Sequence, residues 1–237
     1  MEIDKNRIVV GSLILLFFLF AFFIKLDFLI LTLISLALII ELFKSKFINN
    51  ISDFIVIILF IMVILFIKNY YQIINYLNFF LVFLVIVNIL FPNFHLKKLF
   101  SISIFIFIIN FYFISYIDRN IFYFTIFIAF FNDTIAYIFG RMLKGPLIIP
   151  QISPKKTWTG TSISFVFTLI LISQFNFSVL LASILSISLF IGDIFFSYVK
   201  RKIGLKDFSN FLQGHGGILD RLDSMFFFTI IMSTNLS

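Results

Sequence analysis

Long, nearly uninterrupted apolar runs make up most of the chain, and they constrain its fold more than any other feature. The runs cover roughly residues 8–24, 28–43, 54–67, 73–91, 99–117, 121–140, 161–175, 179–199 and 222–236. A helix needs about 20 apolar residues to cross the hydrocarbon of a bilayer. With 62% hydrophobic and 12% charged residues, the composition lies far outside that of soluble domains. The sequence therefore predicts an integral membrane protein.

The apolar runs are expected to be helices. Backbone polar groups in hydrocarbon must be paired within the structure, so a span is either a helix or a strand of a closed barrel. Barrel strands alternate apolar and polar residues, and these runs do not. Some runs are short for a full span, and the first two fit one tight hairpin as well as two spans. We therefore expect an all-α, polytopic membrane protein with eight or nine transmembrane helices.

The distribution of Lys and Arg predicts the orientation. If the N-terminus is cytoplasmic, only Lys25, Lys68 and Arg119 face the opposite side, and the other 15 of the 18 basic residues are cytoplasmic. Such a bias is typical of inner-membrane proteins, and it also accounts for the net charge of +7 without a basic arm for nucleic acid. No small-residue cleavage pattern follows residues 1–24, which we interpret as an uncleaved first span. We expect a multi-pass protein of the cell inner membrane, with no nucleic-acid partner.

Polar features divide the chain into two parts. Residues 1–120 contain one of the nine glycines and almost no polar residue inside a run, whereas the other eight glycines and five acidic residues follow. Ionisable residues within spans are costly and are functional by default. We therefore expect residues 1–120 to form a helical scaffold and residues 121–237 a catalytic region, within one continuous membrane domain.

A first polar cluster lies near the end of the run 121–140. Asp133, Tyr137 and Arg141 are spaced four residues apart, which places them on one stripe of a helix that leads towards the predicted cytoplasmic side. The alternative is an aspartate that serves packing alone, satisfied by a polar group of a neighbouring helix. We treat the stripe as a candidate substrate-binding element.

A second cluster, Ser153, Lys155, Lys156 and Thr157, lies in the loop before the seventh run. Lysines, hydroxyls and free backbone N–H groups near a helix start are suited to an anionic phosphate. A basic cytoplasmic loop with Trp158 at the membrane interface explains the same composition equally well. Both interpretations stay open on the composition alone.

A third cluster occupies the end of the run 179–199. Asp193, Ser197, Lys200 and Arg201 fall on one helix face. The two basic side chains would reach the surface whatever the function. Asp193 lies more than a turn deeper, so it requires a cation, a basic side chain or a metal ion as its partner.

The fourth cluster combines a glycine-rich turn at 214–217 with two carboxylates, Asp220 and Asp223. Glycines let the backbone approach a ligand closely, and the spacing of the aspartates places both on one face of the last helix. A helix-capping role would explain one of them but not both. Together with Asp193 they are suited to Mg²⁺ bound jointly with substrate phosphates.

Taken together, these motifs resemble the signature of the phosphatidate cytidylyltransferase (CDP-diacylglycerol synthase) family. The pattern is Ser197-x2-Lys200-Arg201-x4-Lys206-Asp207-x7-His215-Gly216-Gly217-x2-Asp220-Arg221-x-Asp223. The stripe that begins at Asp133 and the Ser153–Trp158 loop resemble two upstream motifs of the family, in the right order, so the resemblance covers roughly residues 130–224. This chain departs from the family at Thr159, where an acidic residue is usual, and at Lys144-Gly145, where the family has Gly-Lys.

The resemblance implies a reaction of CTP with phosphatidic acid that gives CDP-diacylglycerol and pyrophosphate on the cytoplasmic side of the membrane. It implies that Asp193 and Asp220 hold Mg²⁺ with Asp223 in support, a second cation being open, and that the family forms homodimers. The catalytic residues would be Asp193, Asp220, Asp223, Lys200 and Arg201. The substrate-binding residues would be Asp133, Tyr137, Arg141, Ser153, Lys155, Lys156, Thr157, Ser197, Lys206, Asp207, His215, Gly216, Gly217 and Arg221.

Two alternatives have to be weighed against this interpretation. The first is another CTP-dependent membrane enzyme, such as a polyprenol or phytol kinase or an ether-lipid cytidylyltransferase, and analysis of the product separates these from phosphatidate chemistry. The second is an ion-coupled transporter that uses Asp133 and Asp193 as relays. A transporter of that kind predicts corresponding polar features in two repeated halves, whereas the polar features here are confined to one half.

Overall fold

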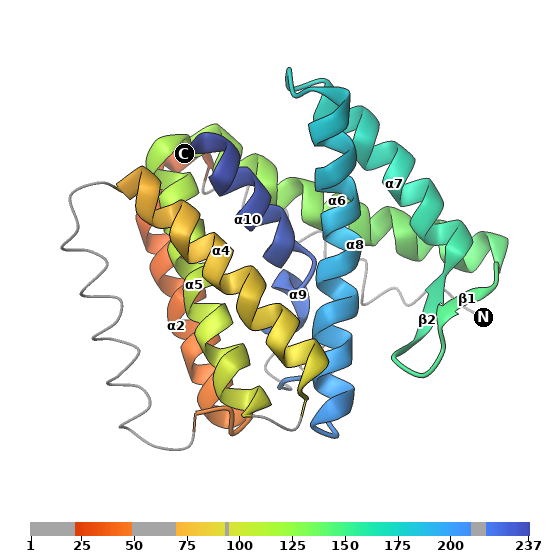
Figure 1. The fold of residues 1–237 in the computed structure, drawn as a ribbon. Helices are drawn as coiled ribbons and strands as arrows, with labels where there is room; N and C mark the ends of the chain where they lie inside the picture. Colours follow the sequence, from red (N-terminus) through yellow and green to blue (C-terminus); the bar gives the residue numbers. More distant parts are fainter. Residues whose placement is uncertain (1–21, 49–69, 93–94, 210–216) are drawn as a thin grey trace.

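A computed structural model describes residues 22–48, 70–92, 95–209 and 217–237 (Figure 1). Its helices are α2 (Asp27–Lys44), α4 (Tyr70–Leu90), α5 (Leu96–Ile117), α6 (Arg119–Leu143), α7 (Trp158–Ser173), α8 (Val179–Lys202), α9 (Leu219–Leu222) and α10 (Met225–Leu236), and its strands are β1 (Leu147–Ile149) and β2 (Ser153–Thr157). Each apolar run within these ranges is helical, as predicted. The run 54–67 and most of the run 8–24 lie outside the described residues.

The described helices differ in length. By length and composition, α4, α5, α6 and α8 are able to cross a membrane, whereas α7 and α10 are shorter apolar helices. A helix rises about 1.5 Å per residue, so the 12 residues of α10 cover about 18 Å, less than the ~30 Å of hydrocarbon. Helix α10, as the structure describes it, is therefore shorter than a full span. The total of eight or nine spans stays a prediction.

The loop between α6 and α7 contains two short strands, which the expectation of an all-α protein did not include. Strands β1 and β2 pair antiparallel, with Leu147 opposite Thr157 and Ile149 opposite Ser153. Prolines 146, 150 and 154 explain this conformation. Proline lacks a donor for a helix and forces the residue before it into an extended conformation.

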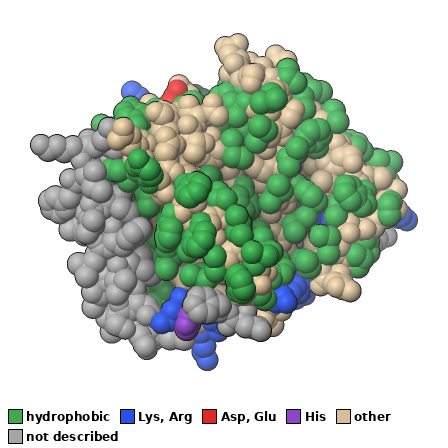
Figure 2. Space-filling view, in the orientation of Figure 1, with side chains coloured by type: hydrophobic (Ala, Val, Ile, Leu, Met, Phe, Trp, Pro, Cys, Tyr) green, Lys and Arg blue, Asp and Glu red, His purple; other side chains and the backbone are tan. Residues whose placement is uncertain are grey.

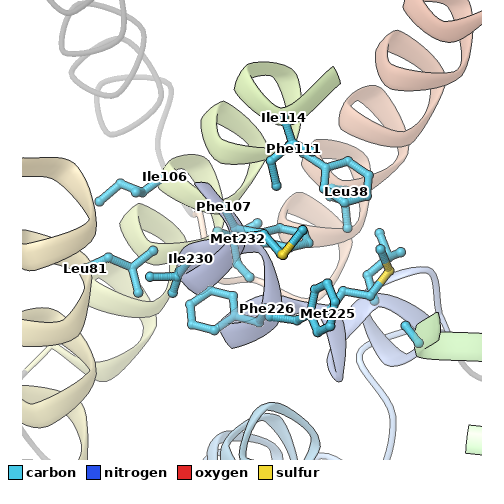
Figure 3. Close-up of a cluster of buried hydrophobic side chains, with 14 of the residues drawn as sticks. Leu38, Leu81, Ile106, Phe107, Phe111, Ile114, Met225, Phe226, Ile230 and Met232 are labelled. Atoms are coloured by element: carbon cyan, nitrogen blue, oxygen red, sulfur yellow. The ribbon is translucent and has the colours of Figure 1, made fainter. Parts of the chain in front are cut away.

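Helix α10 forms the centre of the bundle. It contacts α4, α5, α6 and α8, and Figure 1 shows it between α5 and α8. Its apolar side chains pack with those of α2, α4 and α5 (Figure 3). The cluster includes Leu38, Leu81, Ile106, Phe107, Phe111, Ile114, Met225, Phe226, Ile230 and Met232. Because the last helix is short but buried on several sides, tertiary packing rather than contact with lipid holds it in place.

A chain of buried side-chain hydrogen bonds also joins three helices. Asn78 of α4 donates through Nδ2 to Oγ of Ser233 in α10 at 2.9 Å, and this hydroxyl donates to Oδ1 of Asn110 in α5 at 2.6 Å. All three side chains are buried. Polar side chains in a membrane interior bond across helices in this way. The first part of the chain is thus less uniformly apolar than the sequence analysis assumed.

Helices α6 and α7 pack with their backbones close together. A Cβ atom on Gly160 would lie 2.5 Å from the carbonyl oxygen of Ala136 and 2.9 Å from Cα of Gly140. Small residues permit such close crossings of membrane helices. The crossing positions the β1–β2 hairpin, which leaves α6 and leads directly into α7.

Basic residues gather at one end of the bundle. Helix α2 ends, α5 begins and α8 ends at this end (Figure 1), which brings together the basic residues at 44, 97–98 and 200–202. Figure 2 shows Lys and Arg along this end and a mainly hydrophobic face beside it. At the opposite end, Nε of Arg119 lies 2.6 Å from Oδ2 of Asp27. The positive end is the one predicted to face the cytoplasm, and its orientation in a membrane stays a prediction.

Candidate active site

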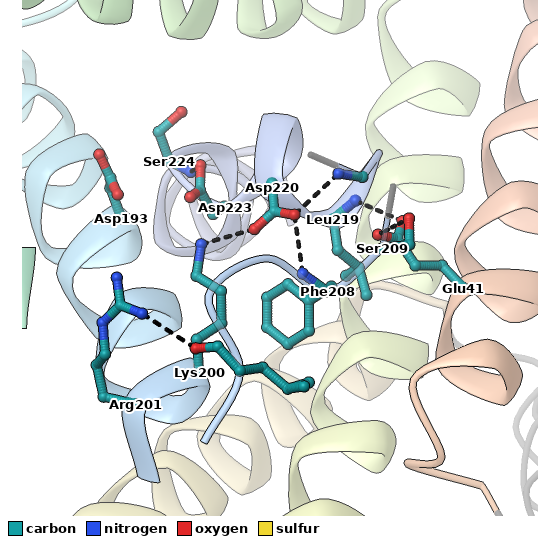
Figure 4. A network of polar contacts seen from close by, with 12 residues as sticks. Glu41, Asp193, Lys200, Arg201, Phe208, Ser209, Leu219, Asp220, Asp223 and Ser224 are labelled. Carbon is teal, nitrogen blue, oxygen red and sulfur yellow. Dashed lines mark hydrogen bonds and ion pairs between the residues drawn. The ribbon is translucent and has the colours of Figure 1, made fainter. Parts of the chain in front are cut away.

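A buried ion pair joins the end of α8 to the short helix α9. Nζ of Lys200 lies 2.6 Å from Oδ1 of Asp220, and the two side chains are only 10% and 8% exposed. The other carboxylate oxygen of Asp220 accepts hydrogen bonds from the backbone N–H groups of Phe208 at 3.0 Å and Gly217 at 2.9 Å (Figure 4). Both oxygens of Asp220 are therefore engaged, one by a cation and one by the loop that precedes α9.

A second ion pair joins the hairpin to α8. The ammonium group of Lys156, on β2, pairs with Oδ2 of Asp193. Burial lowers the pKa of the Lys156 ammonium, while the nearby carboxylates of Asp223 and Asp133 raise it. The Lys156 ammonium thus lies among three carboxylates contributed by α6, α8 and the α9–α10 junction.

A glycine next to Asp193 lets the backbone of α8 approach the backbone at Asp223 closely. A Cβ atom on Gly192 would lie 2.5 Å from the carbonyl oxygen of Asp223 and 3.0 Å from that of Ser224. Asp223 is buried, and its Oδ1 accepts a hydrogen bond from the backbone N–H of Ser224 at 2.8 Å. Figure 4 shows Asp223 between Asp193 and Asp220 in that view. Close contact at Gly192 is therefore what aligns α8 with the start of α10.

The carboxylates of Asp193, Asp220 and Asp223 are the predicted metal ligands. Among the residues that the structure describes, no group of three or more His, Asp or Glu side chains is close enough to hold a metal ion. Asp193 and Asp220 are instead each neutralised by a lysine. Mg²⁺ commonly takes only one or two carboxylates and completes its coordination with water and substrate phosphates. Asp193 and Asp223 beside the Lys156 ammonium fit that donor set, so the residues are suited to a cation bound jointly with phosphate.

The first polar cluster lies on one face of α6, as its spacing predicted. The guanidinium of Arg141 lies over the ring of Tyr137, 4.7 Å from its centroid. Asp133, two turns earlier, lies within the electrostatic influence of Asp223, Lys156 and Arg221. Of this stripe, Asp133 is thus the member that the fold brings to the lysine and carboxylate groups.

The hairpin residues are partly structural. Oγ1 of Thr157 caps α7 by accepting a hydrogen bond from the backbone N–H of Gly160 at 3.2 Å. Arg201 is exposed and donates to the carbonyl oxygens of Ile152 at 3.2 Å and Leu205 at 3.1 Å. Arg201 thereby links the hairpin to the end of α8, a contact that the motif alone did not indicate.

The other predicted residues lie around these pairs. Ser153 begins β2 and is half-buried, Ser197 is buried in α8, and Lys206 and Asp207 are exposed after α8. His215, Gly216 and the side chain of Lys155 lie outside what the structure describes. The predicted roles of His215 and Gly216 at the nucleotide and of Lys155 at a phosphate stay predictions.

The two departures from the family pattern are in contact with each other. A Cβ atom on Gly145 would lie 2.6 Å from Oγ1 of Thr159 and would overlap the rest of that side chain. Oγ1 of Thr159 also donates to Oγ1 of Thr157 at 3.3 Å. Thr159 and Gly145 therefore form one local arrangement beside the start of α7.

One residue at this end of the bundle, Glu41 of α2, was not among the predicted site residues. Its side chain is 3% exposed, and it accepts hydrogen bonds from Oγ of Ser209 at 2.8 Å and the backbone N–H of Leu219 at 2.9 Å. An acidic residue inside an apolar run was the available signal. Its position beside Lys44 made it resemble an ordinary residue at the end of a span.

Comparison with known proteins identifies the family of this chain. The family described as "Cytidylyltransferase family" matches residues 5–237. The chain is 37% identical over 116 residues to the phosphatidate cytidylyltransferase of Rickettsia conorii, covering 42% of this chain and 50% of the relative. It is 41% identical over 103 residues to that of Brucella melitensis, covering 40% and 38%. The chain thus spans half or less of the length of the curated relatives it matches. Because the family match extends over almost the whole chain, this protein belongs to the cytidylyltransferase family.

Proposed function

We propose that this protein transfers CMP from CTP to phosphatidic acid, giving CDP-diacylglycerol and pyrophosphate for phospholipid synthesis. The observation that carries the proposal is the pair of lysines, Lys156 and Lys200, held by aspartates at one end of an apolar bundle. Such a site offers cations to phosphates next to a membrane. Membership of the cytidylyltransferase family supports the nucleotide, and the names of the relatives support the lipid acceptor.

The chemistry needs little proton transfer. An oxygen of the lipid phosphate forms a bond to the α-phosphorus of CTP, while the bond from that phosphorus to the bridging oxygen breaks and its electron pair leaves with pyrophosphate. Nucleophile and leaving group are both anionic already. Catalysis therefore depends on positioning and on charge neutralisation.

Lys156 and Lys200 are the residues suited to that task. Each ammonium group is already partly desolvated, so it attracts an anion more strongly than an exposed lysine would. Phosphate oxygens would compete with Asp193 and Asp220 for these cations. The positive charges that pair with Asp193 and Asp220 would then balance the triphosphate and the lipid phosphate.

Mg²⁺ is the expected cofactor, and when bound it neutralises phosphate charge. Asp193 and Asp223 are the residues that would hold it. Asp220, predicted as a ligand, would become available only if Lys200 turned to phosphate, because both of its oxygens are engaged. His215 has a predicted positioning role rather than that of a general base.

A labelled-CTP assay in detergent micelles tests the proposal. With phosphatidic acid and Mg²⁺, label from α-labelled CTP should enter the lipid phase, and label from γ-labelled CTP should leave as pyrophosphate. Omitting either phosphatidic acid or Mg²⁺ should abolish the transfer. Label entering lipid from γ-labelled CTP would instead identify a kinase. Transfer only to an ether-lipid phosphate would identify a different acceptor.

We also propose that the site faces the cytoplasm, in a homodimer of the inner membrane. Because the chain has no cysteine, single-cysteine variants report sidedness directly. Lys202→Cys should react with an impermeant thiol reagent only in inside-out vesicles, and Lys25→Cys only in right-side-out vesicles. The opposite labelling pattern would reverse the orientation.

A further inference from the structure

A carboxylate from the N-terminal part of the chain is built into the loop that carries Asp220. Oε1 of Glu41 accepts a hydrogen bond from Oγ of Ser209 at 2.8 Å, and Oε2 accepts one from the backbone N–H of Leu219 at 2.9 Å (Figure 4). Leu219 is fully buried. These bonds connect α2 to a segment about 170 residues later in the chain.

Two carboxylates together hold both ends of this loop. Asp220 accepts one backbone N–H from each of the segments 208–209 and 217–219. Glu41 also accepts one hydrogen bond from each of these two segments. The loop ends are therefore crosslinked twice, and one of the crosslinking carboxylates is the partner of Lys200.

Steric fit supports the same relationship. A Cβ atom on Gly217 would overlap the carboxylate of Glu41 and would lie 2.6 Å from Oγ of Ser209. Only glycine leaves room for the Glu41 side chain at this position. The Glu41 carboxylate of α2 thus occupies the space that a side chain at Gly217, the last residue of the glycine-rich turn, would fill.

We propose that Glu41 is a positioning residue that holds the loop end so that Asp220 stays directed at Lys200. A buried acceptor of this kind cannot be removed without leaving the Leu219 N–H unpaired. The loop end would then rotate or become hydrated, and Asp220 would move with it. The consequence for turnover rests on the proposed function, whereas the positioning itself does not.

Two substitutions at Glu41 separate the effect of losing its hydrogen bonds from the effect of losing its negative charge. Glu41→Ala removes both acceptors. Glu41→Gln retains both contacts, because its amide oxygen accepts from the Leu219 N–H and its amide nitrogen donates to the Ser209 hydroxyl, which can also accept. Losing a group that orients a functional side chain typically costs about 10–100-fold in activity. We expect that loss for Glu41→Ala and near wild-type turnover for Glu41→Gln.

Asp27→Asn is the matched control. Asp27 is the first residue of α2, at the end of the helix opposite to Glu41, and it pairs with Arg119. Losing this pair weakens the attachment of α2 without affecting the loop that carries Asp220. We expect Asp27→Asn to lower the melting temperature and to leave kcat unchanged.

Hydrogen exchange without substrate tests the positioning directly. In detergent-solubilised full-length protein, amides of the 217–222 peptide should exchange faster in Glu41→Ala than in wild type. Glu41→Gln and Asp27→Asn should exchange like wild type. Unchanged exchange in Glu41→Ala, or equally fast exchange in Asp27→Asn, would overturn the proposal.

A double substitution gives an independent readout of the steric fit. Gly217→Ala should reduce kcat in the wild-type background, and it should reduce kcat less in Glu41→Ala, where the overlapping carboxylate is gone and only the rotatable Ser209 hydroxyl remains close. Fully multiplicative losses would contradict the direct contact. If even wild-type protein fails to transfer CMP, the proposed function falls, and hydrogen exchange still decides whether Glu41 positions the loop.

Discussion

The ammonium nitrogen of Lys200 lies 2.6 Å from Oδ1 of Asp220, although the two residues belong to different helices and are separated by a loop. Both side chains are almost fully buried. Removing one partner from such a pair leaves an uncompensated charge, which costs about 3–5 kcal/mol. The charges of this pair therefore balance each other, and under the proposed function a phosphate would have to replace Asp220 as the partner of Lys200.

Replacing one member of this pair should destabilise the protein more than replacing both. Lys200→Met is expected to lower the free energy of unfolding by about 3 kcal/mol, because Asp220 stays charged and buried. The double variant with Asp220→Asn should recover most of that loss, and neither should transfer CMP. Thermal unfolding in detergent and the labelled-CTP assay measure the two effects. A double variant less stable than Lys200→Met would show that Lys200 and Asp220 do not form a buried ion pair.

The pair between Lys156 and Asp193 is more open, with side chains 24% and 21% exposed. Asp193→Asn should therefore cost only about 1 kcal/mol of stability, yet it should reduce transfer by on the order of 100-fold or more. Asp118→Ala is the control, because it removes the side-chain cap at the start of α6, far from Asp193, at a similar cost of about 1 kcal/mol. If Asp193→Asn retained as much activity as Asp118→Ala, Asp193 would be removed from the site.

Gly192→Ala should damage both stability and activity. The added methyl group meets the carbonyl oxygens of Asp223 and Ser224, and backbone atoms cannot rotate away as a side chain does. Overpacking of this kind costs about 1–3 kcal/mol, and here it also separates Asp193 from Asp223. Ser183→Ala, at a half-buried position on the same helix whose hydroxyl bonds only within the first turn, should leave transfer unchanged. Wild-type kinetics for Gly192→Ala would show that the close contact is not needed.

Ser233→Ala should affect stability without affecting substrate binding. It removes the hydroxyl that joins Asn78 to Asn110. Interhelical hydrogen bonds in membrane proteins contribute about 0.6 kcal/mol each, so we expect a loss of about 1 kcal/mol. Equilibrium unfolding and the KM for CTP are the measurements. A raised KM with unchanged stability would show that the hydrogen bonds joining Asn78, Ser233 and Asn110 support CTP binding instead.

Local features were predictable because they depend on neighbours in sequence. Continuous apolar runs predicted helices, since backbone groups must be paired in hydrocarbon. The four-residue spacing of Tyr137 and Arg141 predicted one helix face, and the two side chains are in contact. The hairpin at 147–157 was missed, although the prolines at 146, 150 and 154 were visible in the sequence.

The sequence by itself determined that this chain builds a helical membrane protein, and its motifs indicated where the charged residues of the site lie. Only the tertiary structure decided that Lys200 meets Asp220, that Lys156 meets Asp193, and that Glu41 of the first part reaches the loop of the second. Periodicity reports the face of a residue within one helix. Pairing between helices depends on crossings such as the one at Gly192, where a missing side chain sets how closely two distant segments approach.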